Sequence, residues 1–144
     1  MTADLLFSLS SSVAMLGWVI LAIGVVWNKP NLRDVIAGQV FPVGLSVLYT
    51  ILIGAFFFRA KGGFDSLAHV QELFTYPWVA LAGWMHYLAF DLFIGAMIAR
   101  EVMSRGIPRI VLLALLPVTF LFGPIGYLCF ILLRSGLSKS EQVA

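Results

Sequence analysis

The residues of this sequence that could do chemistry are concentrated in one apolar stretch, GWMHYLAFDLFIGAMIAR, at positions 83–100. His86, Tyr87 and Asp91 lie within six positions of one another in this stretch. Histidine and aspartate side chains serve as proton donors and acceptors in enzymes, and tyrosine can join them. The stretch is therefore a candidate for acid–base chemistry, and the elements around it must decide where that chemistry takes place.

The composition predicts an integral membrane protein. Of the 144 residues, 61% are hydrophobic and only 11% are charged, whereas a soluble domain has about 25% charged residues. The Lys and Arg residues lie mainly at the ends of the apolar runs, where basic side chains meet lipid headgroups. No basic run or finger motif supports nucleic-acid binding. We expect a single membrane domain over residues 1–144, with the lipid bilayer as its partner and no nucleic-acid partner.

Four apolar segments are long enough to cross a bilayer, since about 20 helical residues span the hydrocarbon core. Helices are expected because backbone groups in lipid must satisfy their own hydrogen bonds. The predicted fold is therefore all-α, a polytopic bundle of four transmembrane helices. The predicted spans cover residues 5–27, 35–58, 78–99 and 110–133.

A short amphipathic helix is predicted between the second and third spans. Apolar residues recur there at spacings of three to four, and Asp65 is a plausible N-cap. Such a helix should lie in the membrane interface. The apolar residues are Phe64, Leu67, Val70 and Phe74.

Membrane orientation is only weakly predicted. With four spans, both chain ends and the loop between the second and third spans share one side. Basic residues on that side are Arg59, Lys61, Arg134 and Lys139, against Lys29, Arg33, Arg100, Arg105 and Arg109 on the other. This small excess places the chain ends on the non-cytoplasmic face.

The fourth predicted span contains Gly123, Pro124 and Gly126 near its middle. Small residues let helices approach closely in lipid. A mid-span proline frees a backbone carbonyl and kinks the helix, which can shape a cavity. Packing and bending are the simplest interpretation of these residues.

His86 and Asp91 are expected near the middle of the bilayer, because the third span is centred near Ala89. A charged side chain at that depth costs about 2.5–3.5 kcal/mol on an insertion scale, so neither should face lipid. At 3.6 residues per turn the two side chains lie about 140° apart around the helix. They should meet different neighbouring helices or form opposite walls of one cavity.

Two interpretations of each buried polar residue remain open. Asp91 either hydrogen-bonds across helices to lock the bundle or takes part in chemistry or ligand binding. His86 has the same alternatives, whereas His69 in the interfacial helix is expected to be solvated. Candidate partners on the other spans are Gln39, Ser46, Tyr49, Thr50, Thr119 and Tyr127.

The cysteine and histidine counts limit metal chemistry. Cys129 is the single cysteine, which excludes an internal disulfide and a multi-thiolate metal site. With two histidines and few acids, a multi-ligand metal centre is not expected, and no cofactor is required. A haem held by His86 as one axial ligand, or another bound pigment, is an open alternative. The sequence contains no HExxH, GxSxG or phosphate-loop motif.

Two blocks of the sequence resemble the family named after the abscisic-acid-deficient-four protein of plants. They are HYLAFDLFIG at 86–95 and FGPIG at 122–126, and the resemblance covers most of the chain after the first loop. The resemblance implies a membrane-embedded role related to carotenoids, namely the formation of neoxanthin from violaxanthin. In that isomerisation an epoxide opens and an allene forms without net redox change.

This implied reaction assigns provisional roles to the residues of the blocks. Opening an epoxide requires a proton on its oxygen, and forming an allene requires removal of a proton from the polyene. We expect Asp91 to act as the acid and His86 as the base, with Tyr87 orienting the oxygen. Aromatic side chains would form an apolar slot for the substrate. These substrate-binding candidates are Trp84, Phe90, Phe93, Phe122 and Tyr127.

Two other function classes fit the same residues. One is a non-catalytic accessory subunit that binds a pigment or haem, and the other is a small transport or structural protein in which Asp91 holds a proton or ion. The expected partners are a hydrophobic isoprenoid or carotenoid, with a homo-oligomer or a pigment complex as further candidates. The absence of an Arg-rich and Ser-rich leader favours a bacterial inner or photosynthetic membrane over a plastid membrane.

Overall fold

The chain is almost entirely helical, as the sequence predicts. The structure is a computed structural model that describes residues 2–141, with side chains up to residue 136. Its elements are α1 (Ala3–Val26), the π-helix η1 (Asn31–Val40), α2 (Phe41–Phe56), the 3₁₀ turn η2 (Phe57–Arg59), α3 (Leu67–Phe74), α4 (Pro77–Ser104), α5 (Arg109–Leu121) and α6 (Gly123–Glu141). The all-α prediction is confirmed.

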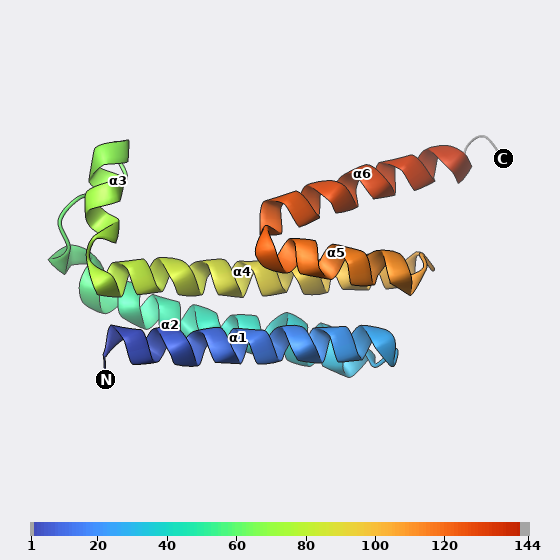
Figure 1. Ribbon diagram of the computed structural model, residues 1–144, viewed down its shortest axis with the longest axis horizontal. Helices are drawn as coiled ribbons and strands as arrows, with labels where there is room; N and C mark the ends of the chain where they lie inside the picture. The colour runs from blue at the N-terminus through green and yellow to red at the C-terminus, as the bar shows by residue number, and fades with distance from the viewer. Residues whose placement is uncertain (1, 142–144) are drawn as a thin grey trace.

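Three helical segments are long and apolar enough to cross a membrane: Ala3–Val26, Asn31–Arg59 and Pro77–Ser104. They lie side by side along the long axis of the molecule (Figure 1). Large apolar side chains remain exposed along them, which suits a lipid-facing surface. The first three predicted spans are therefore present as helical segments long and apolar enough to cross a membrane.

The fourth predicted span, 110–133, is not a single helix, and this part of the prediction is wrong. α5 ends at Leu121 and α6 begins at Gly123. The chain reverses at the break, so that both helices extend from it toward the same end of the bundle (Figure 1). With 13 residues, α5 is about 20 Å long, which is too short to cross the hydrocarbon core. The two helices form a hairpin, which we call re-entrant because both arms return to the same end of the bundle.

The break has a local cause in the sequence. Pro124 has no backbone N–H and cannot donate to the carbonyl of Phe120, four residues earlier. A residue that precedes proline is also disfavoured in the interior of a helix, so Gly123 favours a helix boundary at this point. Phe122 takes up the reversal with φ −144° and ψ 67°. Pro124 then suits the first turn of the new helix.

Small residues let the two arms of the hairpin touch directly after the reversal. A Cβ atom at Gly126 would lie 2.6 Å from the Cα atom of Thr119, a distance that no real side chain could keep. The threonine itself is fully buried. The packing role expected for the glycines of the FGPIG block is therefore observed, but it closes a hairpin instead of bending a span.

The π-helix η1 begins four residues earlier than the predicted second span and carries a partly buried ion pair. Arg33 binds the carboxylate of Asp34 through two hydrogen bonds of 2.8 and 2.7 Å. Arg100 of α4 approaches the same carboxylate at 3.4 Å. Gly24 of α1 lets η1 pack closely against α1, since a Cβ atom at this glycine would lie 2.8 Å from the backbone nitrogen of Arg33.

The predicted interfacial helix is present as α3, with a different cap from the expected one. Ser66 is the N-cap, and its hydroxyl accepts a hydrogen bond of 3.2 Å from the backbone N–H of His69. Asp65 binds the imidazole Nδ1 of the same histidine at 2.8 Å. α3 stands across the end of the bundle (Figure 1), the orientation expected of a helix that lies in the membrane plane.

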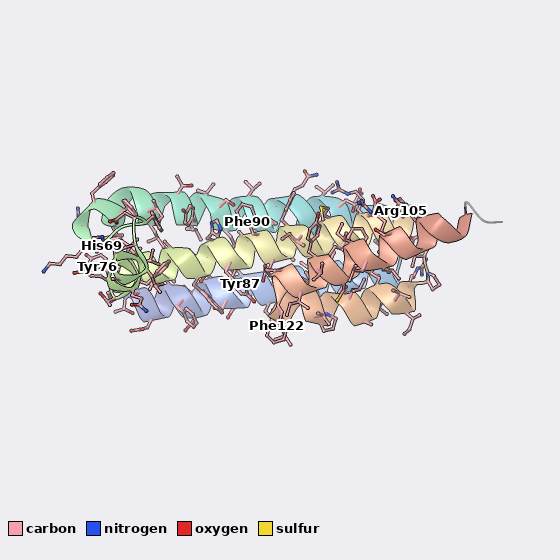
Figure 2. The ribbon with its side chains drawn as sticks, turned by 90° about the horizontal axis from the view of Figure 1, so that it is seen from above. His69, Tyr76, Tyr87, Phe90, Arg105 and Phe122 are labelled. Atoms are coloured by element: carbon pink, nitrogen blue, oxygen red, sulfur yellow. The ribbon has the colours of Figure 1, made fainter. Side chains whose placement is uncertain are left out.

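The re-entrant hairpin changes the charge balance between the two ends of the bundle. It returns α6 to the end that carries the turns after α1 and after α4, where Arg105 is labelled in Figure 2. The elements and turns at this end contain Lys29, Arg33, Arg100, Arg105, Arg109 and Arg134, whereas η2 and the loop after it, at the other end, contain Arg59 and Lys61. Positively charged ends face the cytoplasm, so we infer that this end is cytoplasmic.

We predict that α1 begins and α6 ends on opposite sides of the membrane. In a Cys129→Ser background, single cysteines at Arg105 and Ser135 should be protected together from an impermeant maleimide applied to intact cells. Cysteines at Thr2 and Lys61 should react, because they lie at the opposite end. Labelling of position 135 together with positions 2 and 61 would instead support four complete spans.

Candidate functional site

α4 carries the predicted chemical residues on two different faces. Its 28 residues place its midpoint between Phe90 and Asp91. Figure 2 shows Tyr87 on the side of α4 that faces α1 and Phe90 on the side that faces α2. Asp91 is buried against the hairpin, and His86 is exposed on the α2 side. Of the two arrangements expected for this pair, the structure has the one in which each meets a different helix.

Tyr87 meets the break in the hairpin. Its hydroxyl lies 3.1 Å from the carbonyl oxygen of Phe120 and 3.3 Å from that of Leu121, and it donates to them. These carbonyls lose their helical partners at the break, because Pro124 has no N–H and Ile125 bonds to Phe122 instead. Backbone groups at membrane depth must be satisfied by the protein, so Tyr87 stabilises the reversal.

Asp91 lies against the first residue of α6. A Cβ atom at Gly123 would lie 2.6 Å from the carboxyl carbon of Asp91, so only glycine leaves room for this carboxyl group. The N-terminus of a helix carries positive partial charge and is a favourable neighbour for an acidic side chain. Asp91 is 6% exposed, and its Oδ2 atom has no hydrogen-bond partner among the described residues.

His86 lies on the opposite side of α4, among aromatic rings. Its ring is stacked on that of Phe90 at a centroid distance of 4.7 Å and lies 5.5 Å from the ring of Tyr49 on α2. The imidazole borders a hollow of about 260 Å³. The lining residues of this hollow are Tyr49, Ile53, Phe64, Phe74, Val79, Gly83 and His86.

A second hollow of about 250 Å³ continues along the same two helices. It is lined by Pro42, Val43, Ser46, Ala89, Phe90 and Phe93. The stacked rings of His86 and Phe90 each line one of the two hollows, and we call the two hollows together the α2–α4 groove. Along α4 it extends from Val79 to Phe93, about 21 Å at 1.5 Å per residue.

The α2–α4 groove is closed at one end by the interfacial helix. Phe74 of α3 lines the groove beside Gly83, where a Cβ atom would lie 2.6 Å from the ring. Phe64, in the loop before α3, lines the same end. The sequence predicts these two residues only as part of the apolar stripe of the interfacial helix. Such a stripe indicates that the helix packs on an apolar surface, but the sequence alone does not show which surface that is.

The predicted aromatic slot is divided among three places. Phe90 and Phe93 line the α2–α4 groove beside His86. Trp84 instead faces α1, where its indole N–H donates to the hydroxyl of Ser11 at 3.0 Å. Phe122 is exposed at the hairpin break, as Figure 2 shows, and Tyr127 is exposed on α6. Tyr49, expected only as a hydrogen-bond partner, belongs to the groove.

This division affects the predicted acid–base pair. A proton donor and a base that act in one step must both reach the same bound molecule. α4 separates the imidazole of His86 from the carboxyl group of Asp91, so the structure does not bring these two groups together. Among the described residues, no group of three or more His, Cys, Asp or Glu side chains is arranged to hold a metal ion. His86 is the groove residue that could ligate the metal of a tetrapyrrole.

Residues 5–130 match the family described as ABA DEFICIENT 4-like, and the chain belongs to this family. The matched range includes α4, and with it the residues around His86 and around Asp91. It also includes the hairpin break. No curated protein and no solved structure matches the chain. The family resemblance of the sequence is thereby confirmed.

We predict that Gly123→Ala destabilises the protein, because its Cβ would overlap the carboxyl group of Asp91. Overpacking of this kind typically costs about 1–3 kcal/mol. Gly54→Ala is the matched control, since a Cβ at that helical position meets nothing within 4 Å. Thermal unfolding in detergent should show a lower Tm for the first variant and an equal or higher Tm for the second. Equal stability of both variants would contradict the close contact at the break.

A second prediction concerns the ion pair between Asp65 and His69 of α3. The hydrogen bond between these two side chains raises the pKa of His69 above the usual 6.5 and lowers the pKa of Asp65 below 3.8. The histidine contribution to local stability is therefore lost as pH rises through its raised pKa. The aspartate contribution is lost as pH falls through its lowered pKa. The pair should be complete between these two pKa values.

NMR titration of the His69 imidazole measures this pair directly. The midpoint should lie above 6.5 in the unmodified protein. It should fall in Asp65→Asn and change little in Glu72→Gln, because Glu72 contributes least to the shift. A midpoint that is the same in the unmodified protein and in Asp65→Asn would show that the ion pair does not form in solution.

Proposed function

We propose that this member of the ABA DEFICIENT 4-like family binds a carotenoid-type isoprenoid in the α2–α4 groove and isomerises it. The reaction would be of the neoxanthin-synthase type, in which an epoxide opens and an allene forms. One observation carries the proposal. Among the described residues, His86 is the only ionisable residue other than tyrosine that lines the groove, and it lies near the middle of the groove along α4.

The dimensions and lining of the groove suit a polyene. Its two hollows together follow the helix axes for about 21 Å, so a long and rigid chain would lie along them parallel to lipid tails. Its surface is mainly apolar and aromatic, which is typical of sites for hydrophobic ligands. Exposed Phe90 and Phe93 mark its opening toward lipid, so a substrate dissolved in the bilayer could enter from the side.

A single imidazole can carry out both proton transfers of such an isomerisation. Protonated His86 would donate its proton to the epoxide oxygen, and the carbon–oxygen bond would break to leave a hydroxyl group. The neutral imidazole would then accept a proton from the adjacent polyene carbon, whose electrons complete the allene. The histidine ends as it began, and no redox equivalent is required.

The rings beside His86 would support this chemistry. Opening the epoxide places positive charge on the polyene, and aromatic faces attract cations. Phe90 and Tyr49 are positioned to do this, since their rings lie next to the imidazole. The hydroxyl of Tyr49 offers a hydrogen bond to the substrate oxygen. Asp91 and Tyr87 maintain the hairpin in this proposal and do not touch the substrate.

The test is pigment conversion in a host that accumulates a 5,6-epoxy-xanthophyll and expresses the protein. His86→Phe should reduce the yield of allenic product about 100-fold or more, the range usual for loss of an acid–base group. His69→Gln is the matched control and should retain conversion, because its imidazole pairs with Asp65 outside the groove. Tyr49→Phe should reduce conversion less than His86→Phe.

The outcomes separate the candidate functions. Unchanged conversion by His86→Phe would contradict the assignment of the groove as the reaction site. Loss of conversion in Asp91→Asn, with His86→Phe active, would place the chemistry at the hairpin. A purified protein that carries a carotenoid spectrum without converting the pigment would identify a non-catalytic binding subunit. Haem or another tetrapyrrole on His86 would give a Soret band instead.

A further inference from the structure

We propose that the hairpin break is a binding site for a monovalent cation, formed by Asp91, Tyr87 and two backbone carbonyl groups. The site lies on the opposite side of α4 from the α2–α4 groove and is independent of the function proposed there. Its ligands would be Asp91 Oδ2, the Tyr87 hydroxyl oxygen and the carbonyl oxygens of Phe120 and Leu121.

Oxygen atoms are in excess of hydrogen-bond donors at the break. Tyr87 offers one hydroxyl proton, which two carbonyl oxygens share at 3.1 and 3.3 Å. Each carbonyl oxygen has a second lone pair. Asp91 lies one helical turn from Tyr87 on α4, and its buried Oδ2 has no partner among the described residues. These oxygens have spare coordination capacity.

The charge of the site determines which kind of ion it would bind. None of the ion pairs of the described residues includes Asp91. The first turn of α6 provides only a partial positive charge of about half an elementary charge. A buried carboxylate without full compensation is costly in a low-dielectric environment. A monovalent cation would make the site neutral, whereas a divalent cation would leave a net positive charge in hydrocarbon.

A proton on the Asp91 carboxyl group would be shared with one acceptor oxygen. A cation is coordinated by several lone pairs at once. The spare lone pairs of the Phe120 and Leu121 carbonyl oxygens, which lie beside the Tyr87 hydroxyl, therefore favour a cation.

The ligand types favour an alkali cation. Carboxylate, carbonyl and hydroxyl oxygens suit hard cations, whereas transition metals prefer imidazole or thiolate ligands. The described residues offer no cluster of three or more His, Cys, Asp or Glu side chains. Broken helices whose carbonyl ends coordinate Na⁺ at the bilayer midplane are a recurring feature of membrane transporters. The C-terminal end of α5 has this form.

The experiment measures the Tm of the purified protein in detergent with NaCl, KCl or LiCl. N-methyl-D-glucamine chloride at equal ionic strength is the reference. At least one alkali cation should raise the Tm saturably, by about 5–10 °C at a hundred-fold excess over its dissociation constant. The rise should be retained in Asp4→Asn, the matched control at an exposed acid, and lost in Asp91→Asn.

Tyr87→Phe provides a second variant that keeps the carboxylate. Loss of one neutral oxygen ligand should raise the cation concentration for half effect about ten-fold. If Asp91→Asn does not fold, saturable binding of ²²Na⁺ or ⁸⁶Rb⁺ to the unmodified protein, weakened in Tyr87→Phe, supports the proposal. Equal Tm values in all four salts, or an alkali-specific rise that persists in Asp91→Asn, would overturn it.

Discussion

The need to satisfy two backbone carbonyl groups in the middle of a membrane determines how this protein is arranged. Pro124 and Gly123 interrupt the last apolar segment at its centre, and the carbonyl oxygens of Phe120 and Leu121 lose their helical partners there. In the hydrocarbon core of a bilayer, no water is available to replace them. The hydroxyl of Tyr87 on α4 does so, at 3.1 and 3.3 Å. The hairpin can therefore fold back only where α4 presents this tyrosine.

This constraint explains why one helix supports two separate polar environments. Tyr87 and Asp91 are occupied by the hairpin on the α1 side of α4, with the Asp91 carboxyl group against Gly123. His86 lies on the α2 side, where its ring meets Tyr49 and Phe90. The first environment is enclosed by backbone, whereas the second opens along a groove toward lipid. Stabilisation of the fold and contact with a hydrophobic ligand thus use opposite faces of α4.

Much of this arrangement follows from the sequence, because hydropathy and helical periodicity are local properties. They predict three of the spans, the interfacial helix and the angular separation of His86 from Asp91. The fourth span was wrong because proline inside an apolar helix is compatible with either a kink or a reversal. Whether the helix kinks or reverses depends on which group donates a hydrogen bond to the freed carbonyl groups. That donor is Tyr87, which lies 33 residues from Phe120 along the chain, so a local sequence pattern does not reveal it. The contribution of Phe64 and Phe74 to the groove depends on the same kind of long-range contact.

The reversal at the hairpin is the claim on which the orientation and the proposed cation site depend. Its most direct test is a distance between spin labels at positions 110 and 135, measured by pulsed EPR in a Cys129→Ser background. A continuous helix would separate these positions by about 38 Å, at 1.5 Å per residue. The re-entrant hairpin predicts a distance well below that value, because α5 and α6 extend from the break toward the same end of the bundle (Figure 1). A distance near 38 Å would contradict it.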